Sequence, residues 1–501
     1  MTLRLKAPSL AARFARGATW SLIGMGAAQG LALIASIVVA RLLGKVTFGE
    51  FGIVAGTVGA FGMLAGLGLG LTATKYIAER RTTDPVRAGQ ILGLMTQVAA
   101  ISGGAVALIL FVLAPWLAAQ TLNAPHLSDE LRIGCILLFL NALDGVQTGA
   151  LAGLEAFKAI ARVSLVRGLL SFPVLIAGAW FFGLTGAVVA TVVVGAGGWW
   201  LSLAALRSEC ARAGVRISSR GARGDLPILW RFSLPALLSA IMVAPVMWLA
   251  TAFLANQPGG YGELGLFSAA NQWRKALMFL PSVLLRVALP LMASSVDTER
   301  AGDFGKTLVM TQSLTVAIVV PAGALLMFLS DPIMGLYGKE FTNGAPVLIG
   351  VVCSIMITSI GSSAGAAIEA RGKMWRGLLL NLSWGAVLMA VVWSSAATWG
   401  ARSLAFGSAI AYLVMSLWGF LFIASDLPQG MLPRLFRTLG FIICLTAICV
   451  LLPPKARTLL AAPVALLTAY LTLLAFVDRA FGRAVVSRAR AQLRYAPIGG
   501  K

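Results

Sequence analysis

Long apolar runs alternate with short polar or basic segments along almost the whole chain. A helix crosses a bilayer core with about 20 apolar residues, whereas transmembrane barrel strands show short segments of alternating hydrophobicity. The sequence therefore predicts an all-α, polytopic membrane protein of about 14 transmembrane helices. The runs lie at about 17–40, 50–72, 91–117, 133–154, 164–182, 185–205, 230–256, 265–292, 307–330, 346–368, 378–399, 402–424, 436–453 and 457–477.

Two short motifs recur at nearly the same spacing. FGEFG at 48–52 matches YGELG at 261–265, an offset of 213, and AGLEA at 152–156 matches AAIEA at 366–370, an offset of 214. Because an even number of runs separates the copies, we expect two six-helix lobes in parallel orientation. The predicted domains are a basic N-terminal segment (1–16), an N-lobe (17–205), a linker (206–231), a C-lobe (232–424), helices 13 and 14 (425–477) and a basic tail (478–501).

Lys and Arg gather on one side of the predicted membrane. With the N-terminus inside, the inner segments hold 30 of the 40 cations and the outer loops hold 6. Cytoplasmic loops carry such an excess, so both termini are predicted to be cytoplasmic. The tail interleaves Arg with apolar residues, which is typical of an amphipathic helix on anionic membrane lipids. Nucleic acid is the poorer interpretation for this basic stretch.

The composition also indicates a membrane protein, and it limits the kinds of functional site that the chain can carry. The chain is 59% hydrophobic and 12% charged, with a net charge of +22, which excludes a soluble globular or disordered protein. The five cysteines form no C-x-x-C pair, and the single histidine, His126, is interpreted as a solvated loop residue. No nucleotide-binding loop occurs. We therefore predict no metal, no cofactor and no catalytic residues.

The eighth run carries the cations that topology does not explain. No window of membrane length avoids Arg274, Lys275 and Arg286. Intramembrane cations usually face a bundle interior or a watery cavity, and Lys275 and Arg286 share one helix face because they are eleven residues apart. Asn271 and Gln272 extend this polar surface. The alternative is that the cations lie near the interfaces and snorkel.

The fourth run contains Asp144 near its middle, with Asn141 on the same side. Asp144 is open to three interpretations: a counter-ion for a cavity cation, a protonatable coupling group, or a protonated packing residue. Gln29, in the first run, is an intramembrane amide of the kind that usually forms hydrogen bonds between helices.

Several segments resemble a known family. IVVARLLG at 37–44 followed by FGEFG at 48–52, ATKYIAE at 73–79, residues 149–163 and QWR at 272–274 are similar to bacterial polysaccharide exporters. These are the O-antigen-type (Wzx-like) lipid-linked oligosaccharide flippases of the multidrug/oligosaccharidyl-lipid/polysaccharide exporter superfamily. The resemblance covers about residues 17–424.

The resemblance implies a flippase of the bacterial inner membrane. Its substrate would be an undecaprenyl-diphosphate-linked oligosaccharide, turned to the outer leaflet as two lobes rock about a central cavity, with polysaccharide polymerase or assembly proteins as further partners. Helices one, two, seven and eight line that cavity in the family, so Arg274, Lys275 and Arg286 are expected to bind substrate. Arg41 and Lys75, at the ends of the first two runs, are further candidates.

Two alternatives stay open at this point. A drug/cation antiporter of the same superfamily would rely on membrane carboxylates, and the first, seventh and eighth runs contain none inside. A membrane O-antigen polymerase or ligase would carry a long outer loop with catalytic residues, whereas the longest predicted outer loops here have about 15 residues. The favoured prediction is a transporter, not an enzyme.

Overall fold

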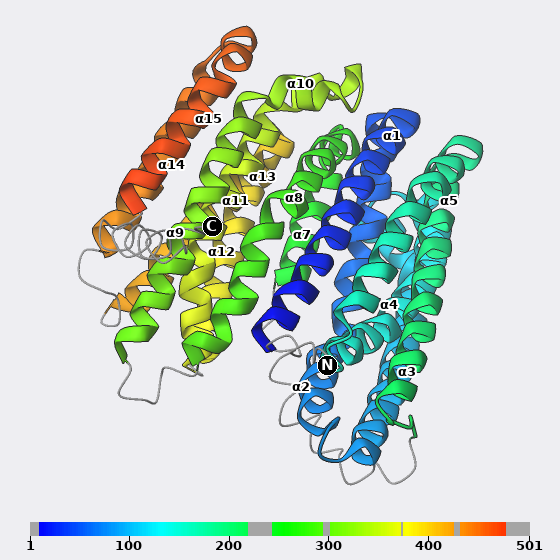
Figure 1. The fold of residues 1–501 in the computed structure, drawn as a ribbon. Coiled ribbons are helices and arrows are strands. Elements are labelled where there is room, and N and C mark those ends of the chain that lie inside the picture. The colour runs from blue at the N-terminus through cyan, green and yellow to red at the C-terminus, as the bar shows by residue number, and fades with distance from the viewer. Residues whose placement is uncertain (1–9, 219–242, 294–300, 372–373, 425–430, 477–501) are drawn as a thin grey trace, which may run out of the picture. The chain divides into compact units, whose positions relative to one another are not determined.

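Helices account for all the regular secondary structure in the part of the chain that the computed structural model describes, residues 10–218, 243–293, 301–371, 374–424 and 431–476 (Figure 1). They are α1 (Leu10–Gly66), α2 (Leu69–Arg80), α3 (Pro85–Trp116), η1 (Leu117–Thr121), η2 (Pro125–Leu127), α4 (Ser128–Gly153), α5 (Phe157–Arg212), α7 (Val243–Ala255), α8 (Gly260–Ala293), α9 (Ala301–Phe328), α10 (Ser330–Gly335), η5 (Lys339–Gly344), α11 (Ala345–Ala370), α12 (Met374–Trp399), α13 (Ala401–Phe422), α14 (Met431–Leu451) and α15 (Pro454–Phe476).

Two of these elements each contain two membrane crossings. α1 has 57 residues and α5 has 56, and at 1.5 Å per residue either would extend about 85 Å. Each is broken at a glycine with left-handed backbone, Gly44 (φ 76°) and Gly183 (φ 58°). The backbones of Gly178 and Gly186 then touch, so α5 is a helical hairpin.

The predicted number of crossings follows from this division. Nine described stretches are long and apolar enough to cross a membrane, and two of them lie in the double elements α1 and α5. α7, α8 and α15 account for the remaining runs, although residues 230–242 of the seventh run lie outside the described residues. The all-α, polytopic fold class is confirmed.

The surface of α3 shows which solvent these helices meet. Ile101, Leu108, Val112 and Trp116 are 58–73% exposed and recur every three to four residues or their multiples along one face. Water-soluble proteins rarely leave so large a contiguous apolar surface uncovered. This face is therefore suited to lipid.

The described chain forms two compact units. The first comprises the described residues up to Ala276 together with Gly335–Phe341 and Leu388–Leu404. In it α1, α3, α4 and α5 pack on one another (Figure 1), and Ile77, Ile91, Met95 and Val146 form part of a core between α2, α3 and α4. This unit contains most of the predicted site residues.

The second unit comprises Leu277–Met334, Thr342–Val387 and the described residues from Ala405 onward. α11 is its most enclosed membrane helix, with 83% of its most apolar window buried. α14 and α15 pack on α9, and Arg457 of α15 pairs with Asp331 of α10 at 3.1 Å. The two extra C-terminal helices are thus fixed to this unit. The division into two six-helix lobes stays a prediction.

Candidate functional site: charged groups within the membrane helices

α8 brings the predicted substrate-binding cations onto one helix. Arg274 is half-buried, and its Nε donates a hydrogen bond to Oδ1 of Asn271, 3.0 Å away and one turn earlier. Residues three apart lie on one helix face, so this amide holds the guanidinium in place. Lys275 is exposed and Gln272 is half-buried. Arg286 belongs to α8, but its side chain lies outside the described residues.

A second intramembrane charge pair lies between α4 and α5. Nη2 of Arg167 donates to Oδ2 of Asp144 at 2.9 Å, and the two side chains are 35% and 14% exposed. Asp144 lies nine residues before the end of α4, and Arg167 lies ten residues after the start of α5. Both are therefore about 14 Å from the turn that joins the helices.

This pair changes the predicted count of cytoplasmic cations and bears on the three interpretations of Asp144. The 30 cations counted on the cytoplasmic side include Arg167, but this residue lies inside the first arm of α5. Asp144 accepts a hydrogen bond from that arginine. The pairing with Asp144 is not predicted from the sequence, because the charge count treats Arg167 as a cytoplasmic cation although the run at 164–182 contains it. In the described structure, Asp144 is the counter-ion of a cation in its own unit.

Neighbouring residues complete the polar cluster around this pair. Gly198, in the second arm of α5, packs on the guanidinium so closely that an added Cβ would lie 2.1 Å from Nε of Arg167. One turn after Asp144, the Gln147 amide exchanges two 3.0 Å hydrogen bonds with the backbone and the indole of Trp199 when it is oriented to satisfy both groups. The cluster therefore joins α4 to both arms of α5.

The other sequence candidates lie on several helices. Arg41 is exposed and donates through Nε to the Leu336 carbonyl. Lys75, on α2, is exposed and lies 5.4 Å from the centroid of the Tyr76 ring. Asn141 is exposed on α4 and Gln29 is half-buried on α1. Their roles in binding substrate stay predictions.

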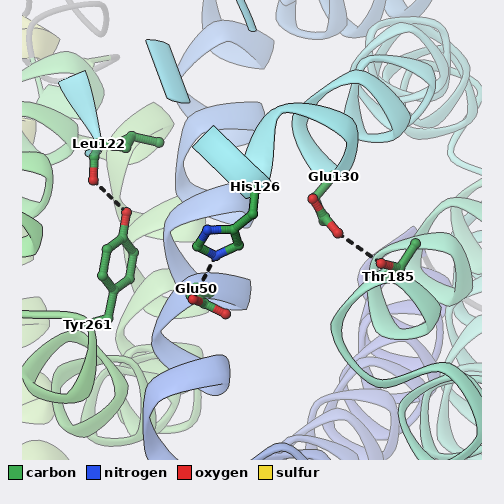
Figure 2. A network of polar contacts seen from close by, with 6 residues as sticks. All are labelled: Glu50, Leu122, His126, Glu130, Thr185 and Tyr261. Carbon is green, nitrogen blue, oxygen red and sulfur yellow. Dashed lines mark hydrogen bonds and ion pairs between the residues drawn. The ribbon is translucent and has the colours of Figure 1, made fainter. Parts of the chain in front are cut away.

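Polar contacts also gather at the end of the first unit that is predicted to face outward (Figure 2). Nε2 of His126 lies 2.9 Å from a carboxylate oxygen of Glu50, and Thr185 donates to Glu130 at 2.8 Å. The Tyr261 hydroxyl donates to the carbonyl of Leu122 at 2.7 Å. The His126 side chain is 60% exposed, in line with its interpretation as a solvated residue, but its ring also bridges η2 to α1.

Comparison with solved structures shows which known fold this chain shares. An inward-facing multidrug resistance MATE family transporter of the MOP superfamily aligns with a TM-score of 0.68, 17% identity, and coverage of 79% of this chain and 95% of the other. The lipid II flippase MurJ in an inward closed conformation aligns with a TM-score of 0.68, 14% identity, and coverage of 91% and 98%. The chain has the helical fold of these membrane proteins.

Sequence comparison gives the family. A model described as "Polysaccharide biosynthesis protein" matches residues 14–296. The EPS I polysaccharide export inner membrane protein EpsE of Ralstonia nicotianae is 26% identical over 83% of this chain and 95% of its own length, and the EpsE protein of Ralstonia solanacearum is 24% identical over the same shares. The chain belongs to the polysaccharide biosynthesis protein family.

Proposed function

We propose that this protein flips a lipid-linked oligosaccharide, carried on undecaprenyl diphosphate, from the inner to the outer leaflet of the bacterial inner membrane, with both termini in the cytoplasm. Family membership and the name of the EpsE relatives support polysaccharide export. The fold shared with MurJ supports a transporter rather than an enzyme. Polysaccharide polymerase or assembly proteins are proposed partners.

The observation that carries the proposal is the pair of neighbouring cations on α8. Arg274 is oriented by Asn271, and Lys275 is exposed beside it. A diphosphate offers several charged acceptor oxygens, and charge-assisted hydrogen bonds to them are about twice as strong as neutral ones. α8 is a 34-residue helix that is otherwise mostly apolar, so we expect a lipid diphosphate that crosses the membrane along it to meet these cations. Arg286, on the predicted same face, would extend the binding surface.

A drug or cation antiporter is the second candidate, and the fold alone does not separate the two because the MATE and MurJ alignments score equally. The carboxylate chemistry favours the flippase. An antiporter needs a membrane carboxylate that exchanges cations, and Asp144 is instead engaged by Arg167 at 2.9 Å. With Arg167 bonded to it, Asp144 is poorly suited to exchange cations.

The test uses a strain that lacks the gene and makes a surface polysaccharide dependent on it. Arg274→Gln and Lys275→Gln each remove one cation, and we expect oligosaccharide delivery to the outer leaflet to fall about tenfold or more, the effect of losing one hydrogen bond to a charged group. The measurement is the amount of lipid-linked oligosaccharide that accumulates on the inner leaflet. Arg437→Gln is the matched control, because it removes an exposed cation from α14, outside the candidate site.

Two results would count against different parts of the proposal. Unchanged delivery in both α8 variants would remove these cations from the substrate site. Absence of any accumulated lipid-linked oligosaccharide in the deletion strain would overturn the flippase function itself.

A further inference from the structure

Hydrogen bonds between the first and second halves of the chain hold the outer end of the first unit together. From the first half, Nε of Arg41 donates to the Leu336 carbonyl at 2.5 Å, and the backbone N–H of Lys45 donates to the Glu340 carboxylate at 3.0 Å. All four residues belong to the first compact unit. The loop that follows α10 is thereby tied to the turn in α1.

The reciprocal contacts run from the second half to the first. The Tyr261 hydroxyl donates to the Leu122 carbonyl at 2.7 Å (Figure 2), and the Asn256 amide donates to the Thr121 carbonyl at 2.7 Å. The turn between α7 and α8 is thereby tied to the end of η1. We call these reciprocal contacts the outer clasp, formed by Arg41, Lys45, Thr121, Leu122, Asn256, Tyr261, Leu336 and Glu340.

The two sides of the outer clasp correspond through the internal repeat. Leu122 and Leu336 are 214 residues apart, the offset found between the repeated motifs. The carbonyl of each accepts a hydrogen bond from the opposite half of the chain. Equivalent turns in the two halves of the chain therefore each accept a hydrogen bond from the opposite half. Such a reciprocal arrangement is expected where two copies of one unit meet about an axis.

Glycines of the repeated motifs bring the two backbones together beneath the clasp. An added Cβ at Gly49 would lie 1.9 Å from the carbonyl oxygen of Tyr261, and one at Gly265 would lie 2.0 Å from that of Lys45. No side chain larger than hydrogen fits at such a distance. Both halves of the repeat are thus shaped for this contact.

We infer that the outer clasp is the gate at the outer end: it is shut in this structure and must open once in each transport cycle. The inference rests on the proposed function. Three of its four hydrogen bonds are solvent-exposed and three end on backbone carbonyls. Bonds of this kind are individually weak, because water replaces either partner readily. A set of them suits an element that closes and reopens.

The first test measures opening without using transport. Ser268 is half-buried and faces Gly52 beneath the clasp. In a Cys444→Ser background, which removes the one exposed native cysteine, Ser268→Cys is labelled from outside with a membrane-impermeant maleimide. We expect Arg41→Met and Tyr261→Phe each to raise the labelling rate about fivefold, the effect of losing one hydrogen bond.

The control for labelling is Arg81→Met. Arg81 pairs with Glu155, and both belong to the first half of the chain. Its loss should leave the labelling rate of Ser268→Cys unchanged. Equal rates in the parent, Arg41→Met and Tyr261→Phe proteins would overturn the gate.

The second test asks whether the clasp must open for transport. Thr121→Cys with Asn256→Cys places two thiols across it, and Arg81→Cys with Glu155→Cys places two within one half. Oxidation of the first pair should stop oligosaccharide delivery and reductant should restore it, while the oxidised control pair continues to work. Full activity of the oxidised clasp would overturn the inference. If labelling behaves as expected but the deletion strain accumulates no lipid-linked oligosaccharide, the gate stands and the flippase function fails.

Discussion

Two sets of intramembrane charges in this protein are satisfied in opposite ways. Asp144 and Arg167 neutralise one another between α4 and α5. Lys275 on α8 is exposed and pairs with no carboxylate among the described residues, and Arg274 beside it is oriented by an amide. Burying an uncompensated charge is costly, so an internally paired cation serves the fold. A cation that the protein leaves accessible is available to a ligand.

The largest effect on stability is expected from removing Asp144, the acid of the internal pair. Asp144→Ala leaves Arg167 uncompensated inside the membrane helices. We expect a loss of about 3 kcal/mol of stability, the lower end for a broken buried pair, because Arg167 is 35% exposed. The measurement is thermal unfolding of the purified protein in detergent.

The double variant Asp144→Leu/Arg167→Met is the control for this prediction. It replaces the pair by apolar side chains of similar size, which is often neutral, so stability close to that of the parent is expected. If the double variant were as unstable as Asp144→Ala, the missing counter-ion would not be the cause.

A smaller effect is expected from crowding the pair without changing its charge. Gly198→Ala places a methyl group against the Arg167 guanidinium, and overpacking of this kind costs about 2 kcal/mol. Thermal unfolding again reports it. Gly197→Ala, one residue earlier in the same helix, meets nothing within 4 Å and should not destabilise. Equal behaviour of the two variants would show that Arg167 moves aside freely.

The smallest effect on stability is expected at the α8 cations. Lys275→Gln changes an exposed side chain, so the stability should stay within about 0.5 kcal/mol of the parent although oligosaccharide delivery falls. Comparing unfolding temperature with delivery in the same variant checks this separation. Lys275→Arg, which keeps the charge, should retain more delivery than Lys275→Gln. A destabilisation as large as that of Asp144→Ala would make Lys275 a structural residue.

The membrane crossings could be predicted from the sequence because each one needs its own long apolar run. The length of such a run does not depend on how the helices pack. Side-chain partners depend on how helices pack, which the runs do not encode. The pairing of Asp144 with Arg167 could nevertheless have been predicted. Residues 144 and 167 lie almost equally far from the turn at 154–156, so a hairpin places them at one depth.

The functional contacts were harder to foresee for a different reason. Arg41 and Tyr261 donate to backbone carbonyls, and every residue has a carbonyl, so no residue type marks the acceptor. The bridge from His126 to Glu50 is similar, since 76 residues separate the partners. The repeat offset is visible in the sequence, but the crosswise contact between its copies depends on how the helices pack.

The glycine turns have a consequence for how much of this protein is accessible beyond its helices. Gly44, Gly183 and Gly400 each reverse or redirect the chain between neighbouring helical segments with a single left-handed residue. Almost no polypeptide then projects beyond the helix ends at these turns. If the turns face the periplasm as predicted, a periplasmic protease would find few peptide bonds to cleave there, and each hairpin would need to export only a tight turn as it inserts.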